Sequence, residues 1–296
     1  MSERSDVTFL VKSERCAGWL YLPPRRSRRG SCVVMAHGIT GTKDFALPAY
    51  AERFSEAGHA VLTFDYRHFG SSQGEPRQLV DVGRQIEDIR AALDFARSRV
   101  EVDPERVLLW GTSLGAGHVV SVSASDQRLA AAIAQLPFLG VDPRHKSPRP
   151  LRVTLELVSR AIADAFGALF GHVPVMVPML GLPGRFAVFT GDEDYKSMRE
   201  LEARAPTWRN EMAARSLFSL LRYRPVKMAK RVAMPLLIAA ADRDTATSAR
   251  LIEEVAQRAP CSKLLHYPGS HFGAYVGSVF DQMMADETAF AAEHLA

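Results

Sequence analysis

Short apolar, β-rich runs alternate with longer helical patterns along most of this chain, and that alternation constrains its fold more than any other feature. Consecutive parallel strands need a long crossover, which is usually a helix. The pattern therefore predicts an α/β fold, with a mostly parallel sheet covered by helices on both faces. The predicted strands are residues 31–36, 60–65, 106–110, 129–135, 235–241 and 263–267, after an antiparallel pair at 8–11 and 16–22. The predicted helices are residues 45–57, 79–99, 114–125, 248–258 and 276–294.

The alternation lapses between residues 138 and 232, where prolines divide helical stretches near residues 151–170 and 217–221. An irregular, helix-rich block between two regular α/β halves is typical of an inserted cap. We therefore expect an α/β core made of residues 1–137 and 233–296, with residues 138–232 as a cap or lid. Residues 138–232 are called the cap segment below.

Composition excludes several classes of protein. The 296 residues are 47% hydrophobic and 24% charged, which is ordinary for a globular chain. The net charge is only +4, and the basic run at residues 25–29 is typical of a solvated loop, so we expect no nucleic-acid partner. The apolar stretch at residues 161–182 is interrupted by Asp164, His172 and two prolines, so we expect no stable membrane insertion. The polar N-terminus is unlike a signal peptide, and we expect a cytoplasmic protein.

We expect no metal and no cofactor. Cys16, Cys32 and Cys261 are too few and too scattered for a zinc site or a disulfide framework. The glycines of residues 111–115 lack the spacing of a dinucleotide or phosphate-binding loop. A small molecule is therefore the expected partner, and a homodimer is compatible with the sequence.

The sequence Gly-Thr-Ser-Leu-Gly at residues 111–115 stands between an apolar strand and a helical run. Its glycines leave room for a sharp strand-to-helix turn, which holds the serine hydroxyl above the sheet edge, beside the positive helix N-terminus. Such a motif matches by chance in roughly one chain in ten of this length, so its strand–turn–helix context carries more weight. We interpret Ser113 as a candidate nucleophile.

A serine nucleophile needs a base, and the base needs a carboxylate to orient it. Of the nine histidines, His271 lies in a turn-rich loop between the last predicted strand and the last predicted helix. Two candidate acids, Asp242 and Asp244, follow the predicted strand at residues 235–241. The residues thus predict a triad of Ser113, His271 and one of these two aspartates.

The chain order serine, acid, histidine, with a His-Gly pair at the end of an early strand, resembles the α/β-hydrolase family. The motifs at residues 37–44, 65–72 and 269–272 are similar to a bacterial subgroup of dienelactone-hydrolase-like and X-Pro-peptidase-like hydrolases. The resemblance covers nearly the whole chain outside the cap segment. It implies an α/β-hydrolase fold, in which residues 65–72 form a structural turn without a catalytic role.

The resemblance also implies roles for individual residues. In that family the acid follows three positions after a small residue that ends the strand, and with Ala241 in that position the acid is Asp244. The backbone N–H groups of Ile39 and Leu114 are implied as the oxyanion hole. His37 is implied to be structural.

The stretch at residues 166–183 is unusually apolar and is divided by prolines. Above a serine nucleophile it would form a hydrophobic lid; the alternatives are the core of the cap itself and a surface that touches lipid. We expect a substrate pocket lined by Phe138, Met176, Met179 and Phe272. Nothing in the cap segment resembles an anion clamp, so we predict an uncharged or weakly polar acyl substrate of small to medium size.

These features predict a cofactor-independent, esterase-like serine hydrolase that cleaves an ester, lactone or thioester through an acyl-enzyme on Ser113. The same triad supports acyl transfer when an alcohol or amine replaces water, and it supports C–C or peptide bond hydrolysis. Relatives with an aspartate nucleophile, the haloalkane dehalogenases and epoxide hydrolases, are disfavoured by the serine. The alternative from a different class is a catalytically inactive ligand-binding module.

Overall fold

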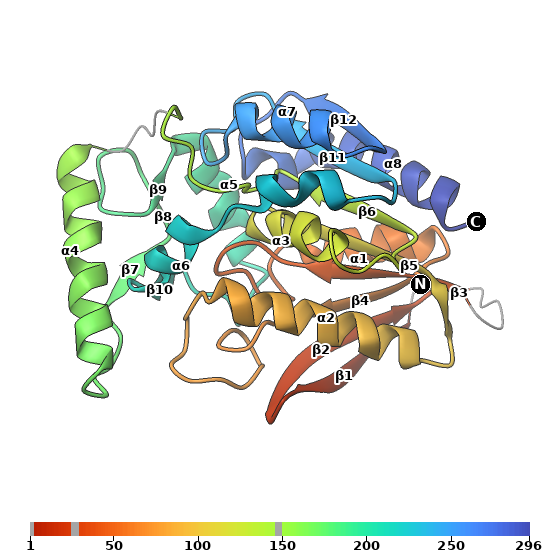
Figure 1. Ribbon diagram of the computed structural model, residues 1–296, viewed down its shortest axis with the longest axis horizontal. Helices are drawn as coiled ribbons and strands as arrows, with labels where there is room; N and C mark the ends of the chain where they lie inside the picture. The colour runs from red at the N-terminus through yellow and green to blue at the C-terminus, as the bar shows by residue number, and fades with distance from the viewer. Residues whose placement is uncertain (1–2, 25–29, 146–149) are drawn as a thin grey trace.

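The computed structural model describes residues 3–24, 30–145 and 150–296. The basic run at residues 25–29 lies outside the described residues. An eight-stranded sheet crosses the molecule in the order β1-β2-β4-β3-β5-β6-β11-β12 (Figure 1). Its strands are β1 (Glu3–Val11), β2 (Glu14–Leu22), β3 (Gly30–Ala36), β4 (Ala60–Phe64), β5 (Val102–Thr112), β6 (Ala131–Gln135), β11 (Leu236–Ala241) and β12 (Ser262–Tyr267). The pairings of β1 with β2 and of β2 with β4 are antiparallel and the others are parallel, so the predicted mostly parallel sheet is confirmed.

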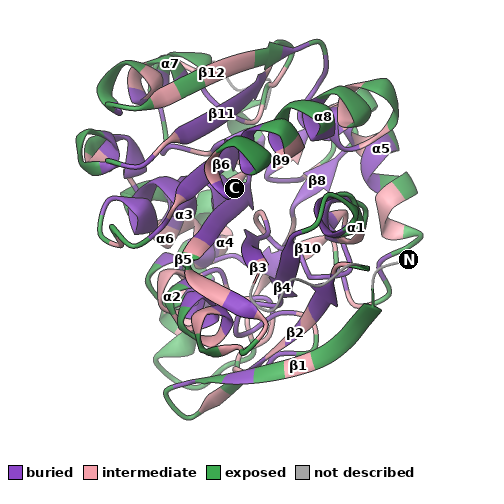
Figure 2. Ribbon diagram, turned by 90° about the vertical axis from the view of Figure 1, so that its right-hand side faces the viewer, coloured by how far each residue is buried: buried purple, intermediate pink, exposed green. Residues whose placement is uncertain are grey.

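Helices cover both faces of the sheet, as predicted (Figures 1 and 2). Side chains of β3 alternate between two buried clusters, because successive residues of a strand point to opposite faces. Val34 packs in the cluster that contains α2, α3 and α7, whereas Val33 packs in the cluster that contains α1 and α8. These helices are α1 (Leu47–Glu56), α2 (Val82–Ser98), α3 (Leu114–Ser123), α7 (Ala249–Arg258) and α8 (Gly277–His294).

Capping side chains set where two of these helices begin. The Asp81 carboxylate accepts a hydrogen bond of 3.1 Å from the backbone N–H of Arg84, so α2 begins three residues after its predicted start. Ser248 caps α7 in the same way, through the backbone N–H of Leu251 at 3.4 Å. These local hydrogen bonds satisfy amide groups that would otherwise lack acceptors in the first turn.

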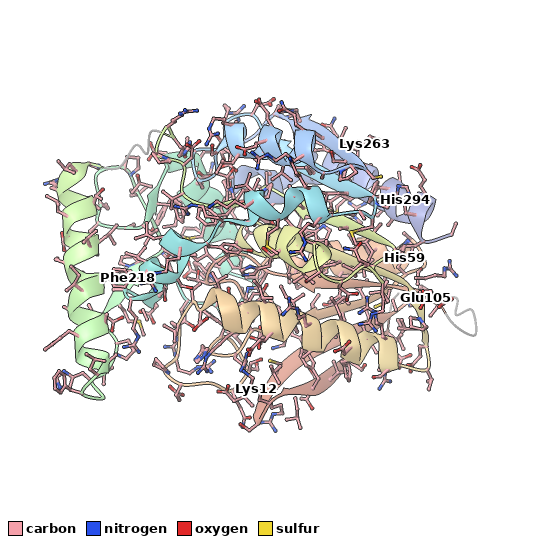
Figure 3. All side chains as sticks on the ribbon, in the orientation of Figure 1. Lys12, His59, Glu105, Phe218, Lys263 and His294 are labelled. Carbon is pink, nitrogen blue, oxygen red and sulfur yellow. The ribbon has the colours of Figure 1, made fainter. Side chains whose placement is uncertain are left out.

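The two edges of the sheet are polar. Lys12, in the turn between β1 and β2, and Lys263, on β12, mark opposite sides of the molecule (Figure 3). Most of β1 is exposed, whereas β3 and β6 are buried (Figure 2). Charged residues on edge strands disfavour pairing with another chain.

The cap segment lies beside the large sheet, whose eight strands all come from residues 3–135 and 236–267. The cap segment follows β6 and precedes β11 in the chain, and these two strands pair with each other in the large sheet. Two of its helices were predicted, whereas α5 and the short strands were not. Its elements are α4 (Leu151–Ala168), β7 (Met176–Pro178), β8 (Leu180–Gly181), β9 (Phe189–Thr190), α5 (Asp192–Glu202), β10 (Glu211–Ala213), α6 (Ser216–Arg222) and η1 (Pro225–Arg231).

The elements of the cap segment differ in what they contact. β7 pairs with β10, and β8 pairs with β9. The last element, η1, packs against α3 and α7 of the core. In contrast, α4 stands at the edge of the molecule, away from the large sheet (Figure 1). Among the described helices, none is both long and apolar enough to span a membrane.

Candidate active site

Ser113 occupies a strained turn between β5 and α3. Its φ of 55° and ψ of −117° are unusual for a residue with a side chain. Neighbouring segments hold it there, because its N–H donates to the Gln135 carbonyl at 2.9 Å and its carbonyl accepts from the Phe138 N–H at 2.9 Å. A Cβ at Gly115 would lie 2.3 Å from the Ala36 carbonyl oxygen, which explains the need for glycine after the serine. The turn thus has the geometry of a nucleophile elbow.

His271 and Asp244 form a buried hydrogen-bonded pair. His271 Nδ1 lies 2.7 Å from Asp244 Oδ2, and the two side chains are only 3% and 4% exposed. Burial lowers the pKa of His271, but the charge and hydrogen bond of Asp244 outweigh it, and the pKa is raised above its ordinary value. The imidazole is therefore oriented by the Asp244 carboxylate and is more basic than usual, as a general base requires.

The Asp244 carboxylate accepts several hydrogen bonds besides its contact with His271. It accepts hydrogen bonds from the backbone N–H groups of Ala246 at 2.7 Å and Thr247 at 3.1 Å, and from the Thr247 hydroxyl at 2.8 Å. Burial raises the pKa of Asp244, but His271 and these donors outweigh it, so the pKa is lowered. Asp242 lies on the surface instead, where its carboxylate is 3.1 Å from His266 Nδ1. Of the two candidate acids, Asp244 is the one that contacts His271.

The turn after β3 approaches Ser113 through its backbone. A Cβ at Gly38 would lie 3.0 Å from Ser113 Cβ and 3.6 Å from Ser113 Oγ, so this peptide is close to the hydroxyl. A hydrogen bond of 3.1 Å from the Gly41 N–H to the Gly38 carbonyl closes the turn. Ile39 lies within it, and Leu114 begins α3, where an N–H has no intrahelical acceptor. Both residues line the same cavity as Ser113, which is where an oxyanion hole would have to be.

His37 supports this turn. Its Nδ1 lies 3.0 Å from the Gly38 carbonyl oxygen, and its Nε2 accepts a hydrogen bond of 3.4 Å from the Tyr66 N–H. Burial lowers the pKa of His37 to about 4, so the ring is neutral at pH 7. Both nitrogens contact the backbone, which gives the ring a positioning role in the turn.

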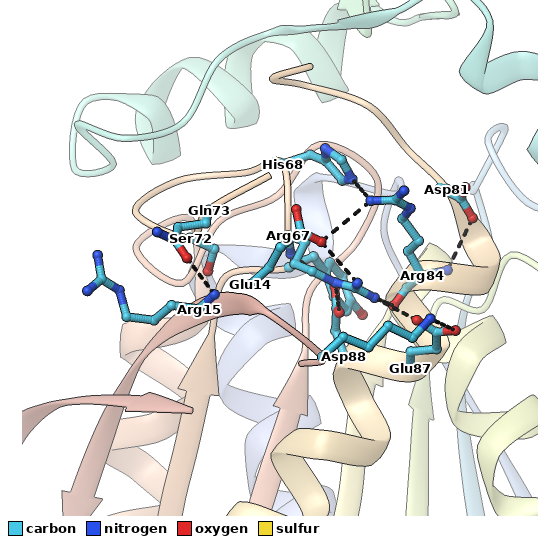
Figure 4. A network of polar contacts seen from close by, with 12 residues as sticks. Glu14, Arg15, Arg67, His68, Ser72, Gln73, Asp81, Arg84, Glu87 and Asp88 are labelled. Carbon is cyan, nitrogen blue, oxygen red and sulfur yellow. Dashed lines mark hydrogen bonds and ion pairs between the residues drawn. The ribbon is translucent and has the colours of Figure 1, made fainter. Parts of the chain in front are cut away.

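A buried ion pair ties the same turn to residues 65–72. Asp65 accepts hydrogen bonds from the backbone N–H of Lys43 at 2.6 Å, from Lys43 Nζ at 2.7 Å and from the Ser71 N–H at 2.8 Å. A second pair, between Arg67 and Asp88, anchors these residues to α2 (Figure 4). These two ion pairs hold the 65–72 segment against the turn after β3 and against α2.

Two small cavities of about 30 Å³ each lie at Ser113 and His271. A larger groove of about 860 Å³, beside Trp19, is lined by neither of these residues. Both small cavities are lined by Ile39, Met179 and Phe272; the first adds Leu114, Phe138, Phe189, Leu220, Ala246 and Thr247, and the second adds His37, Gly38, Gly41, Phe45, Ala46, Thr112 and Tyr275.

The predicted pocket is partly matched by these linings. Phe138, Met179 and Phe272 line the cavity, but Met176 does not: it lies in β7, opposite Ala213 of β10. Phe189 and Leu220 were missed, because only the folding of the cap segment brings β9 and α6 to Ser113. Their apolar character was visible in the sequence, but it did not distinguish them from core residues.

The apolar stretch at residues 166–183 divides between two locations. Met179 and Leu180 are buried, whereas Phe166 and Phe170 are each 64% exposed and Val173 is 86% exposed. The stretch as a whole therefore does not lie over Ser113, and its buried and exposed parts correspond to different alternatives among those that the sequence left open. The reason is that α4 uses another face, with Leu157 and Asp164, to pack on the rest of the protein.

The described residues contain no group of three or more His, Cys, Asp or Glu side chains arranged to hold a metal ion. Cys16 and Cys32 are buried free thiols, and Cys261 is exposed.

Comparison with known proteins places the chain in a family. The family model described as serine aminopeptidase, S33, matches residues 27–271. Quorum-quenching protein AidA of Acinetobacter baumannii is 38% identical, over 96% of this chain and 93% of its own. Thiohydrolase aneE of Aspergillus aculeatus is 29% identical, over 99% and 94%, and polyketide transferase ATR5 of Stachybotrys chlorohalonatus is 33% identical, over 75% and 73%.

The fold is shared with solved structures. The crystal structure of the α/β-hydrolase GrgF from a Penicillium species has a TM-score of 0.83 and 24% identity, covering 99% of both chains. The sheet order, the helices on both faces and the family match agree with one another. The chain therefore belongs to the serine aminopeptidase S33 family and is an enzyme of the α/β-hydrolase fold.

Proposed function

We propose that this enzyme is a cofactor-independent serine hydrolase that cleaves an ester, lactone or thioester bond of an apolar acyl substrate. The observation that carries the proposal is the buried hydrogen bond between His271 and Asp244, at the cavity that also contains the strained Ser113. A surface or core histidine has no need of a buried carboxylate partner beside a serine elbow. The same observation disfavours an inactive ligand-binding module.

In the proposed reaction, Ser113 Oγ attacks the substrate carbonyl carbon while His271 accepts the hydroxyl proton. The backbone N–H groups of Ile39 and Leu114 stabilise the negative charge on the carbonyl oxygen. The bond to the leaving oxygen or sulfur then breaks, and that atom takes the proton from His271. Water, activated by the same imidazole, releases the acid from the acyl-enzyme. Asp244 keeps the imidazole oriented throughout.

The cavity lining supports an apolar acyl group. Apart from histidines, the described residues that line the two cavities carry no charge. Each cavity holds only about 30 Å³, whereas sites for small molecules usually hold about 300 Å³ or more. Met179, Phe189 and Leu220 close the cavity from the cap segment. We infer that residues 138–232 act as a cap that moves to admit substrate.

Acyl transfer is the second candidate. A closed apolar cavity limits the access of water to an acyl-enzyme, and an alcohol or amine acceptor could then replace it. The chain is similar both to a protein named polyketide transferase and to one named thiohydrolase. This similarity supports acyl transfer as well as hydrolysis as a candidate reaction. The two reactions share every step up to the acyl-enzyme, so the acceptor distinguishes them.

The test is intact-mass spectrometry after treatment with a fluorophosphonate, which labels activated serines. We expect one adduct on the wild type, none on Ser113→Ala or His271→Ala, and an adduct on His266→Ala, whose ring lies on the surface. A wild type without an adduct would contradict the proposal. A panel of p-nitrophenyl esters, thioesters and lactones, with and without an added amine, then separates hydrolysis from transfer. Equal turnover of apolar and highly charged acyl donors would contradict the assigned substrate class.

A further inference from the structure

The outward side of α4 carries a continuous apolar surface. Residues 151, 155, 162 and 166 recur at helical spacing, so they form one stripe along the helix, and residues 169 and 170 extend it just past the helix end. The exposed fraction of the residues in this surface ranges from 57% to 78%. We define the outer face of α4 as Leu151, Leu155, Ile162 and Phe166 of the helix together with Leu169 and Phe170, which directly follow its last residue.

The opposite side of α4 fixes the helix to the protein. Val153 and Leu157 are buried there, facing the side where α6, which carries Phe218, packs (Figure 3). Buried Asp164 accepts hydrogen bonds from the backbone N–H of Val175 at 3.0 Å and of Arg215 at 2.8 Å. Rotating α4 to bury its outer face would break these bonds and expose the inner side. The outer face is therefore directed outward by the fold itself.

The size of this surface exceeds what single chains usually expose. The six side chains of the outer face together expose about as much as four whole residues, which is on the order of 800 Å². The largest apolar patch of a typical monomer is about 300–600 Å². A stable protein interface buries about 800 Å² on each partner. The outer face alone is thus large enough for one side of a dimer.

The charges around the outer face favour protein over lipid as the partner. Helices that lie on anionic membranes carry several cations beside their apolar face. On α4, the side chains of Arg160 and Glu156 pair with each other at 2.7 Å, and Arg160 also stacks on Phe186 at 4.3 Å. Arg152 is then the one cation of α4 for which the described residues provide no anionic partner. A second copy of this chain presents the same apolar stripe, and two such stripes can pack together without surrounding cations.

We propose that the outer face of α4 is a homodimer interface, in which two copies pack α4 against α4 about a twofold axis near Ile162. A straight stripe is complementary to itself under such an axis, because each copy presents the same surface. Phe166 and Phe170, whose rings are 5.1 Å apart, provide adjacent aromatic anchors of the kind that dominate interface energies. This interface is independent of the reaction proposed for Ser113.

Sedimentation velocity and light scattering test the interface on the full chain. We expect a dimer at micromolar concentration, and a dissociation constant raised at least about 100-fold by the double substitution Ile162→Glu and Phe166→Glu. The matched control is Val100→Glu, which also places a charge at an exposed apolar residue, 74% exposed, outside α4. Because all three side chains are on the surface, thermal melting should show folded protein in each case.

Three outcomes would overturn the interface. They are a wild type that stays monomeric at about 100 μM, a dimer that survives the double substitution, and a monomer that binds phosphatidylserine vesicles through α4. A second measurement, disulfide cross-linking, does not depend on a change in the dissociation constant of the dimer. Ile162→Cys in a Cys261→Ser background should form an intermolecular disulfide on mild oxidation, whereas Val100→Cys in that background should not. Absence of the Ile162→Cys cross-link would also reject the interface.

Discussion

The carboxylate of Asp194, in the first turn of α5, accepts a hydrogen bond of 2.8 Å from the backbone N–H of Phe272. Phe272 directly follows His271, so the cap segment contacts the loop that carries the proposed base. Its neighbour Glu193 lies 3.2 Å from Arg243, in the loop of the proposed acid. One turn of α5 thus contacts both loops of the candidate site.

Replacing Asp194 by asparagine tests whether this contact adjusts the base. Burial lowers the pKa of His271, and the charges of Asp244 and Asp194 raise it. Removing one negative charge should lower that pKa, so the acidic limb of kcat/KM should move to lower pH. The control is Asp192→Asn, on an exposed residue of the same turn, which should leave the pH profile unchanged. Identical profiles for the two variants would show that Asp194 only holds the loop in place.

The two candidate acids offer a matched pair of substitutions. Asp244→Asn keeps the shape of the side chain but loses the charge that orients His271, so kcat should fall by roughly 10⁴-fold. Asp242→Asn alters only a surface contact with His266 and should change kcat by less than about twofold. Steady-state kinetics on an activated ester measure both. A larger effect at Asp242 would reverse the assignment of the acid.

Gly38→Ala tests the proposed oxyanion turn. The new Cβ would lie 3.0 Å from Ser113 Cβ, which would displace the peptide next to Ile39. Loss of one oxyanion donor typically costs about 10²–10³ in kcat. We expect kcat to fall on that scale, with a smaller change in KM. Gly269→Ala is the control in the His271 loop, because its nearest neighbour would be 3.6 Å away. Equal losses in the two variants would point to general disorder of the site.

Buried Glu287 predicts a pH-dependent stability. Burial raises the pKa of this α8 carboxyl from 4.5 to about 8, although its Oε2 accepts a hydrogen bond of 2.8 Å from Trp110. Between pH 4.5 and about 8, the Glu287 carboxyl keeps its proton in the folded protein but releases it in the unfolded chain. The free energy of unfolding should therefore fall as pH rises through about 4.5 to 8.

Glu287→Gln should remove this dependence, because an amide can accept from Trp110 without ionising. At pH 7 the variant should be more stable than the wild type, by up to about 3 kcal/mol. Urea unfolding at pH 5, 7 and 8.5 measures the effect, with the exposed Glu293→Gln on the same helix as the control. A wild-type stability that stays constant over that range would contradict the prediction.

The sequence was a good guide to the core because its signals are local. β-rich runs mark the strands, and Asp81 and Ser248 mark helix starts through their own side chains. α5 was missed because its sequence is dominated by charge, and its buried residues include Asp194 and Ser197 rather than an apolar stripe. Its helix depends on contacts with loops distant in the chain.

The candidate site likewise has some residues that local sequence signals predict and others that depend on contacts between distant segments. Ser113 and His271 could be identified because a turn motif and a loop position are encoded nearby in the sequence. The choice of Asp244 over Asp242 needed a family resemblance, since both aspartates follow the same strand. The lining of the cavity could be predicted only in part. Met176 and Met179 are three residues apart, yet only Met179 reaches Ser113, because pairing of β7 with β10 decides which side chains face inward.

The cap segment begins after β6 and ends before β11, and these two strands pair with each other. This arrangement has an evolutionary consequence. Leu236 of β11 lies opposite Ala132 of β6, so the register of the sheet is set without the cap segment. Insertions, deletions or exchange between 138 and 232 can therefore change the side chains that line the cavity at Ser113 while the strands that precede the proposed triad residues stay in place. New substrate ranges could arise by recombination of one continuous stretch of gene, without redesign of the chemistry.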